Sequence, residues 1–156
     1  MIKDLTPSQK GAVAEAALSA AAMELGVMVL RPVCEGYRYD LIFDLEPRLL
    51  RVQCKWAARC GEVLMARCAT CRLTPSGYVR STYSADEVDA IALYAPAVKR
   101  CYLLPIEEAA DRKTISLRLA PTANNQASGI RWARDYELAN SLERYWPRAA
   151  VLHPRG

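Results

Sequence analysis

The stretch RYDLIFDLEPRLLRVQCKWA, residues 38–57, decides the fold. It contains two short segments rich in Leu, Ile and Val, and the turn between them, at residues 46–47, predicts a β-hairpin. Three polar residues, Asp40, Gln53 and Lys55, interrupt the apolar pattern. Strands this apolar could have one purely hydrophobic face, so the polar residues indicate a functional site on the hairpin.

The pairing of the predicted hairpin brings these polar side chains together. A loop centred on residues 46–47, whether two or four residues long, places Asp40 directly opposite Gln53. Because side chains alternate along a strand, Lys55 shares the face of Gln53 and lies about 6.5 Å further along. Apolar residues then take the other, buried face: Leu50, Val52, Cys54 and Trp56.

A helix is predicted before the hairpin, over residues 6–26. Thr6 is a candidate N-cap, and Pro7 suits the first helical turn. Gln9 completes a capping box with Thr6. Gly26 is placed to end the helix.

Glu15 is expected on the sheet-facing side of that helix. It shares a stripe at helical spacing with small and apolar residues: Gly11, Leu18, Ala22 and Leu25. A carboxylate aimed at the core needs a partner, and Lys55 or a metal ion would provide one. Alternatively, Glu15, Asp40 and Lys55 could form an ordinary, partly exposed ion-pair network.

The remaining segments complete a mixed α/β fold. Ser84 is a candidate cap for a short turn, residues 121–129 form a polar loop, and residues 133–146 form a closing helix. We find no repeat or linker, so we expect one domain over residues 1–156, with a mixed β-sheet flanked by helices. Extended segments are predicted at residues 27–32, 39–44, 49–57, 62–73, 90–95, 101–106 and 114–120.

Composition narrows the functional classes. The chain is 52% hydrophobic and has a formal net charge of +4, which is typical of a globular protein and only weakly favours a polyanionic partner. No segment resembles a membrane span or a signal peptide, which predicts a cytoplasmic protein. His153 is the single histidine, so histidine-based catalysis is not expected. The CxxC of Cys68 and Cys71 lacks the second pair of a zinc ribbon.

These residues, in this order, resemble the PD-(D/E)xK, or restriction-endonuclease-like, nuclease superfamily. Its pattern has an acidic residue on the first helix, an Asp starting one strand and (D/E)xK on the next. Glu15, Asp40 and QCK at residues 53–55 match it, with Gln53 in place of the usual acid. The QxK variant is similar to the branch that includes the homing endonuclease of cyanobacterial group I introns and its bacterial relatives. The likeness covers most of the chain, in KGAVAEAALSAAAMELG, YDLIFD, DEVDAIALYA, CYLLPI and LRLAPTANNQASGIRWARDYEL.

The resemblance implies a restriction-endonuclease-like core and a Mg²⁺-dependent endodeoxyribonuclease, with Mn²⁺ as a substitute ion. Asp40 would be the principal metal ligand, Gln53 would add a neutral oxygen, and Glu15 would bind the metal or orient a water. Lys55 would orient or help deprotonate the attacking water, or hold negative charge near the phosphate. Because Gln53 removes one negative charge from the site, weaker metal binding is expected. The same change leaves open a catalytically silent DNA-binding module of the same fold.

Double-stranded DNA is the partner that the resemblance implies. We prefer a site-specific, homing-endonuclease-like role, with a Holliday-junction resolvase as the alternative enzyme. One active site per chain means that cutting both strands requires at least a homodimer, and the resemblance to the homing endonuclease suggests a homotetramer. Three parts of the sequence offer candidate DNA contacts, and each also has an ordinary structural interpretation. Position 51 could be an exposed charge, residues 70–89 could form a hairpin with a polar face, and residues 121–129 could form a turn. The candidates are Arg51, Arg72, Tyr78, Arg80, Ser81, Tyr83 and Asn125.

Overall fold

The computed structural model describes residues 4–147, except for the side chains of Cys71, Arg72 and Arg80. The helices in this range are α1 (Pro7–Glu24), α2 (Ile106–Ala109), the 3-10 helix η1 (Ala133–Tyr136) and α3 (Leu138–Tyr145). The strands are β1 (Met28–Leu30), β2 (Leu41–Asp44), β3 (Leu49–Trp56), β4 (Ala58–Cys60), β5 (Val63–Arg67), β6 (Thr70–Thr74), β7 (Gly77–Ser81), β8 (Ala90–Ala95), β9 (Arg100–Pro105) and β10 (Thr114–Arg118). None of these helices is long and apolar enough to cross a bilayer.

The described strands form three sheets, of which the largest has the order β1-β2-β3-β8-β9. β3 and β8 run parallel, whereas the other neighbours in this sheet run antiparallel. A smaller sheet has the order β10-β5-β4, and β6 pairs with β7 alone among the described strands. The predicted mixed α/β architecture is therefore confirmed.

The β2–β3 hairpin has the predicted register. Leu41 pairs with Val52 across the two strands, which places Asp40, one residue earlier, opposite Gln53. The Asp40 N–H donates to the Val52 carbonyl at 2.9 Å and continues the pairing beyond the end of β2. Of the residues expected on the other face, three are buried and the fourth is half-buried: Leu50, Val52 and Cys54, and Trp56.

α1 has the predicted capping at its N-terminus. The Gln9 N–H donates to the Thr6 hydroxyl oxygen at 3.2 Å, and the Thr6 N–H donates to the Gln9 side chain at 2.9 Å. Gly26 follows the helix with a φ of 76°, a value that glycine adopts without strain. The sequence signals for this helix are thus confirmed at both ends.

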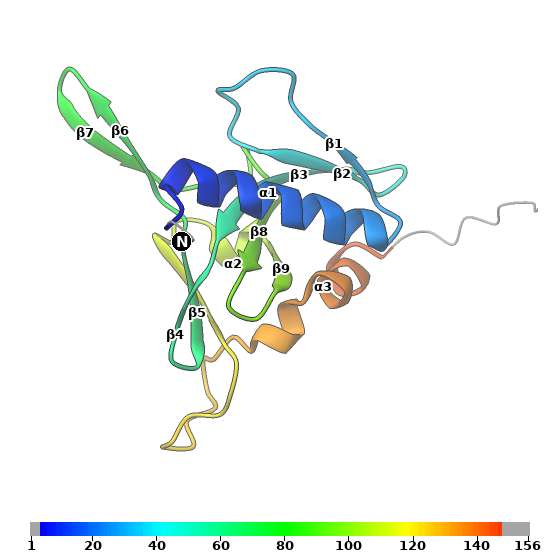
Figure 1. The fold of residues 1–156 in the computed structure, drawn as a ribbon, viewed down its shortest axis with the longest axis vertical. Helices are drawn as coiled ribbons and strands as arrows, with labels where there is room; N and C mark the ends of the chain where they lie inside the picture. Colours follow the sequence, from blue (N-terminus) through cyan, green and yellow to red (C-terminus); the bar gives the residue numbers. More distant parts are fainter. Residues whose placement is uncertain (1–3, 148–156) are drawn as a thin grey trace, which may run out of the picture.

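α1 lies across β3 and β8 (Figure 1) and packs on one face of the large sheet through Leu18 and Ala22. Leu25 was expected on the same stripe but is 43% exposed. The reason is that α1 ends at Glu24, so Leu25 no longer follows the helical spacing. Glu15 lies at the margin of the stripe and is only half-buried.

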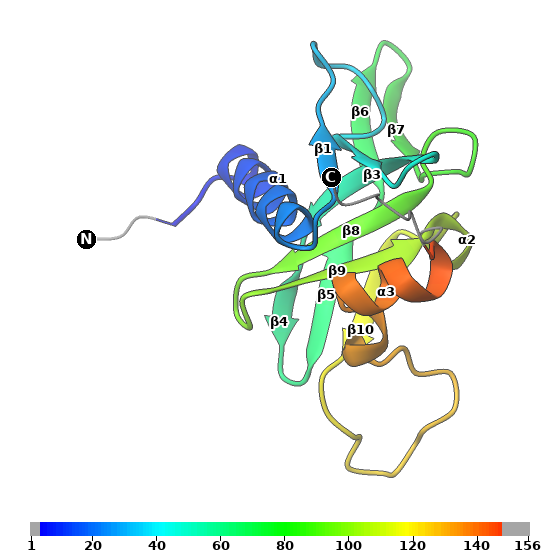
Figure 2. The ribbon, with the colours of Figure 1, turned by 90° about the vertical axis from the view of Figure 1, so that its right-hand side faces the viewer.

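The large sheet is covered on both faces. α1 and α3 pack on the first face, and residues of β5, β10, α2 and η1 form the core on the second. Figure 2 shows α1 on one side of β8 and β9 and the small sheet below these strands. Away from the β1–β2 margin, where Met28, Leu30 and Leu49 are exposed, the sheet is buried on both faces, so polar functional groups there reach solvent at its edges and at the ends of its strands.

The structure divides two segments that the sequence predicted to be continuous. Residues 62–73 were predicted as one strand but form β5 and β6, because the Cys68 N–H still donates to the Lys113 carbonyl beside β10 whereas β6 leaves to pair with β7. The predicted closing helix of residues 133–146 is divided into η1 and α3. Glu137, between them, is extended and forms a bridge with Tyr102 of β9. β4 and the short helix α2 were not predicted.

The β6–β7 hairpin extends away from the body of the molecule in both views (Figures 1 and 2). Its turn links Thr74 to Gly77, and the Thr74 hydroxyl donates to the Gly77 carbonyl at 2.7 Å. Large side chains near the turn are exposed: Leu73, Tyr78 and Val79. A hairpin that buries so little against the rest of the chain is well placed to contact a partner.

Candidate active site

Asp40 is fixed at the end of β2 by the backbone of both hairpin strands. Its own N–H is bonded to Val52, and its Oδ2 accepts the Cys54 N–H at 2.9 Å. Burial raises the pKa of the Asp40 carboxyl, and the hydrogen bond from Cys54 and the charges of Lys55 and Arg31 oppose this increase. The side chain is therefore a pre-positioned oxygen donor that is costly to ionise without a further cation.

Glu15 comes to the same place from α1. Glu15 and Asp40 both line an open pocket of about 390 Å³, to which residues 31–37 also contribute. Burial, and then the negative charge of Asp40, raise the pKa of the Glu15 carboxyl, while Arg31 lowers it. The helix α1 and the β2–β3 hairpin thus bring these two carboxyl groups into one pocket.

Gln53 and Lys55 approach the site from β3. Gln53 is 9% exposed and lies opposite Asp40 by register, so its amide is held in a nearly dry position. The ammonium nitrogen of Lys55 lies 5.0 Å from the centroid of the buried Tyr83 ring. Lys55 forms no ion pair with the acidic side chains of residues 4–147. Its charge nevertheless acts on Asp40, whose carboxyl pKa it lowers, so the Lys55 ammonium lies near the site without a direct ion-pair partner among these residues.

The donor set of this site suits a hard divalent cation. Two carboxyl groups, of Glu15 and Asp40, share a pocket, and the Gln53 amide adds a neutral oxygen donor beside Asp40. Mg²⁺ favours oxygen ligands from one or two carboxylates together with water and phosphate. Within the described chain no three His, Cys, Asp or Glu side chains gather into a possible metal cluster, so a metal at this site would depend on Gln53, water or substrate for its remaining ligands.

Arg31 is a member of the pocket that the sequence reasoning missed. Its Nη1 lies 3.5 Å from Oε2 of Glu15, and its side chain is 56% exposed. It follows β1 directly, and neither a motif nor a periodic pattern distinguishes this position in the sequence. The structure alone brings this guanidinium beside Glu15 and Asp40.

Arg51 is engaged within the chain rather than displayed on the surface. Its guanidinium donates to both carboxylate oxygens of Asp89, at 3.1 and 3.2 Å, and to the carbonyls of Asp86 and Ala85. The Arg51 N–H also donates to Asp89 at 2.7 Å. These bonds use four of the five guanidinium N–H groups, so Arg51 is not a free exposed charge, and a phosphate contact would have to compete with these partners.

The position of Tyr83 does not suit its predicted role as a DNA contact. Its side chain is 4% exposed and belongs to the core beneath the large sheet. A ring buried to this degree cannot reach a nucleic acid in this conformation. Instead it contacts two cations, Lys55 and Arg38.

The other candidate DNA contacts are divided between the hairpin and a turn. Tyr78 on β7 is 76% exposed, and the Ser81 hydroxyl lies 2.9 Å from that of Thr70. Asn125 has a φ of 55°, and its N–H donates to the Thr122 carbonyl. This residue therefore lies in a turn, as the alternative interpretation of residues 121–129 predicts. Arg72 lies on β6 and Arg80 on β7, and their side chains are outside the described part of the structure.

Comparison with known proteins agrees with this geometry. The model of the PD-(D/E)XK endonuclease family matches residues 5–139. A solved structure, that of the bacterial homing endonuclease I-Ssp6803I, superposes with a TM-score of 0.71 at 25% identity and covers 88% of this chain and 93% of its own. Among curated proteins, none matches significantly.

The predicted fold class and the predicted family are both confirmed by these matches. The matched family residues span α1, the β2–β3 hairpin and the strands that support them. The structural match extends over nearly the whole length of both chains. The chain belongs to the PD-(D/E)XK endonuclease family.

Proposed function

We propose that the protein is a Mg²⁺-dependent endodeoxyribonuclease that cleaves double-stranded DNA at specific sites in the cytoplasm. One observation carries the proposal: the β2–β3 register sets Asp40 opposite Gln53, with Glu15 in the pocket of Asp40 and Lys55 two residues along β3. A family of endonucleases and a homing endonuclease of similar structure support this choice of reaction.

Asp40, Gln53 and Glu15 would hold the divalent cation. Bound there, a divalent cation would act as a Lewis acid towards the phosphate and lower the pKa of a bound water. The Asp40 carboxylate is already oriented by the Cys54 N–H, so little rearrangement is needed to present its oxygens. Mn²⁺, which also accepts oxygen ligands, is expected to support the reaction.

The cationic side chains would act on the phosphate and the water. Lys55 would orient the attacking water or stabilise negative charge on the phosphate, since its charge already acts on Asp40 while its ammonium forms no direct ion pair with the acidic side chains of residues 4–147. Arg31, which now faces Glu15, has the planar donors that suit a phosphate group. We expect this guanidinium to move from Glu15 to the DNA backbone when the substrate binds.

The β6–β7 hairpin is the proposed main contact with DNA. Its exposed Tyr78, with Arg72, Arg80 and Ser81 on the same two strands, provides groups for phosphate and groove contacts. We leave Arg51 and Tyr83 out of this surface because of their internal contacts. Each chain would have one active site, so cleavage of both DNA strands requires at least a homodimer. A homotetramer is the larger assembly that we consider.

The test is cleavage of supercoiled plasmid and of a synthetic four-way junction, with Mg²⁺ or Mn²⁺. Lys55→Ala is expected to lose nicking and cutting while it keeps its fold, and Lys113→Ala serves as the control because Lys113 is exposed and does not line the pocket of Glu15 and Asp40. Equal cleavage by wild type and Lys55→Ala would contradict the assignment of the site. Preference for the junction over duplex DNA would indicate a resolvase.

A silent DNA-binding module is the second candidate, and Gln53 is the observation that favours it. Loss of one carboxylate weakens the attraction for a metal ion. DNA binding without cleavage in either metal, unaffected by Lys55→Ala, would select this function over the nuclease.

A further inference from the structure

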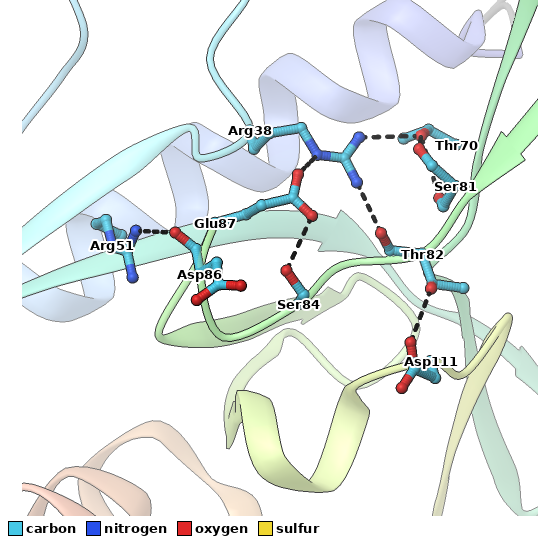
Figure 3. Close-up of polar contacts among 9 residues, drawn as sticks. All are labelled: Arg38, Arg51, Thr70, Ser81, Thr82, Ser84, Asp86, Glu87 and Asp111. Atoms are coloured by element: carbon cyan, nitrogen blue, oxygen red, sulfur yellow. Dashed lines mark hydrogen bonds and ion pairs between the residues drawn. The ribbon is translucent and has the colours of Figure 1, made fainter.

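Arg38 connects three segments that meet beside the active site. Its Nη1 donates to the Thr70 hydroxyl oxygen at 3.1 Å, its Nη2 donates to the Thr82 carbonyl at 2.9 Å, and its Nε forms an ion pair with Glu87 (Figure 3). Thr70 begins β6, and Thr82 directly follows β7. One guanidinium therefore holds both strands of the hairpin at its base.

Tyr83 lies between this guanidinium and the active-site lysine. The Cζ atom of Arg38 is 4.2 Å from the centroid of the Tyr83 ring, and the Nζ atom of Lys55 is 5.0 Å from it. The ring is 4% exposed, so both cation–π contacts are largely shielded from water, where such contacts are strongest. Arg38 has its charge balanced by Glu87, whereas Tyr83 is the aromatic support that the structure gives Lys55.

A second arginine, Arg51, holds the segment that follows Tyr83. Arg51 on β3 bonds to Asp89 and to the carbonyls of Ala85 and Asp86 (Figure 3 draws the Asp86 bond). Arg38 is two residues before Asp40, and Arg51 is two residues before Gln53. Residues 82–89 are thus fixed to both chain segments that supply the site, and they begin where the hairpin ends.

We propose that Arg38 and Tyr83 are positioning residues that hold the Lys55 ammonium in place and couple the base of the β6–β7 hairpin to the active site. The coupling role rests on the proposed nuclease function, whereas the positioning of Lys55 can be measured without it. When the hairpin engages DNA, a shift at its base reaches Arg38 and then the ring that supports Lys55. Misplacement of a reacting group by about 1 Å can lower a rate about 100-fold.

The first measurement is the rate constant for plasmid cleavage at saturating protein, with DNA affinity determined separately on a labelled duplex in Ca²⁺. Arg38→Ala and Tyr83→Leu are expected to cleave about 10- to 100-fold more slowly with unchanged affinity. Tyr83→Phe is expected to keep the wild-type rate, because it retains the ring. Arg59→Ala is the matched control, since Arg59 also has a nearby ion pair and a carbonyl partner but lies on β4.

The second measurement reports on Lys55 directly and needs no cleavage. Lysines occur at positions 3, 10, 55, 99 and 113, so NMR of ¹³C-dimethylated lysines gives few signals, and Lys55→Arg identifies the one that matters. The ring current of Tyr83 should shift that signal upfield. We expect Tyr83→Leu to remove the shift, Arg38→Ala to reduce it and Tyr83→Phe to retain it.

These outcomes separate positioning from simple stabilisation. An unchanged Lys55 signal in both Arg38→Ala and Tyr83→Leu would overturn the proposal, as would cleavage that falls only in proportion to DNA affinity. Arg38→Lys, which keeps a cation but loses the forked donors, replaces Arg38→Ala if the latter does not fold. If the wild type fails to cleave while the Lys55 signal responds as expected, the positioning contact stands and the nuclease function is refuted.

Discussion

At the scale of single residues, the unusual feature is an amide where the family pattern has an acid. Gln53 lies opposite Asp40, whose carboxyl pKa is already raised by burial, and near the pocket in which the Glu15 pKa is raised as well. A third carboxylate would add repulsion in the absence of metal. If Gln53 is a metal ligand as proposed, the amide would favour the stability of the metal-free protein and weaken its metal affinity.

Gln53→Glu should reverse this balance. Without metal, we expect its free energy of unfolding to fall by about 1–3 kcal/mol, because a further charge is placed in a nearly dry position. With Mg²⁺ or Mn²⁺ we expect tighter binding than in the wild type, measured by isothermal titration calorimetry and by the metal-induced rise in Tm. Gln126→Glu, in an exposed loop, is the control. Equal metal affinity in Gln53→Glu and wild type would show that Gln53 is not a ligand position.

At the scale of secondary-structure elements, the segment between β7 and β8 depends on the pairing of Arg51 with Asp89. Burial raises the pKa of the Asp89 carboxyl, but hydrogen bonds from the Arg51 side chain and backbone more than offset this, and the net result is a lowered pKa. The ordinary pKa of this carboxyl, which applies to the unfolded chain, is 3.8. Because the pKa is lower in the folded state, ionised Asp89 stabilises the fold at pH values above 3.8. This stabilisation is lost as the pH falls through the folded pKa.

Asp89→Asn should therefore lose stability at neutral pH but not in acid. We expect its free energy of unfolding at pH 7 to be lower by about 1–2 kcal/mol, since the pair is partly exposed and partly screened. The difference from wild type should narrow as the pH falls below about 4. Urea unfolding of the variant and of wild type, at pH 7 and below about pH 4, measures this difference in stability. Asp135→Asn, at an exposed position, is the control. A difference that stays constant with pH would contradict a role for the ionised pair.

The elements show which parts of the fold a sequence can predict. The capping box of α1 and the β2–β3 register depend on neighbouring residues and on alternation, so local rules sufficed for Asp40 opposite Gln53. The division between β5 and β6 depends instead on a contact more than forty residues later in the chain. The Cys68 N–H donates to the carbonyl of Lys113, which directly precedes β10. Arg31, Arg38 and Tyr83 lie near the site through such distant contacts; of the three, the sequence indicates only Tyr83, and as a DNA contact.

At the scale of the whole molecule, the active site, the 82–89 segment and the projecting hairpin lie next to one another in the fold. The remaining faces of the large sheet are occupied by α1 and α3 on one side and by the small sheet on the other. In the described residues, Glu15 and Asp40 share one pocket, and β3 brings Gln53 and Lys55 to its margin. A single copy can then present one hydrolytic centre to one strand of a duplex.

Mixing active and inactive copies tests this consequence. Wild type is expected to convert supercoiled plasmid to linear product, whereas a one-to-nine mixture with Lys55→Ala should give mainly nicked circles. In a randomly assembled dimer, about 18% of the assemblies would contain one active copy and about 1% would contain two. Gel electrophoresis of the plasmid gives the ratio of nicked to linear DNA, and a mixture with Lys113→Ala, which keeps its site, should still yield linear product. If the ratio in the Lys55→Ala mixture equals that of wild type diluted to the same active concentration, each copy acts independently and the requirement for an oligomer is wrong.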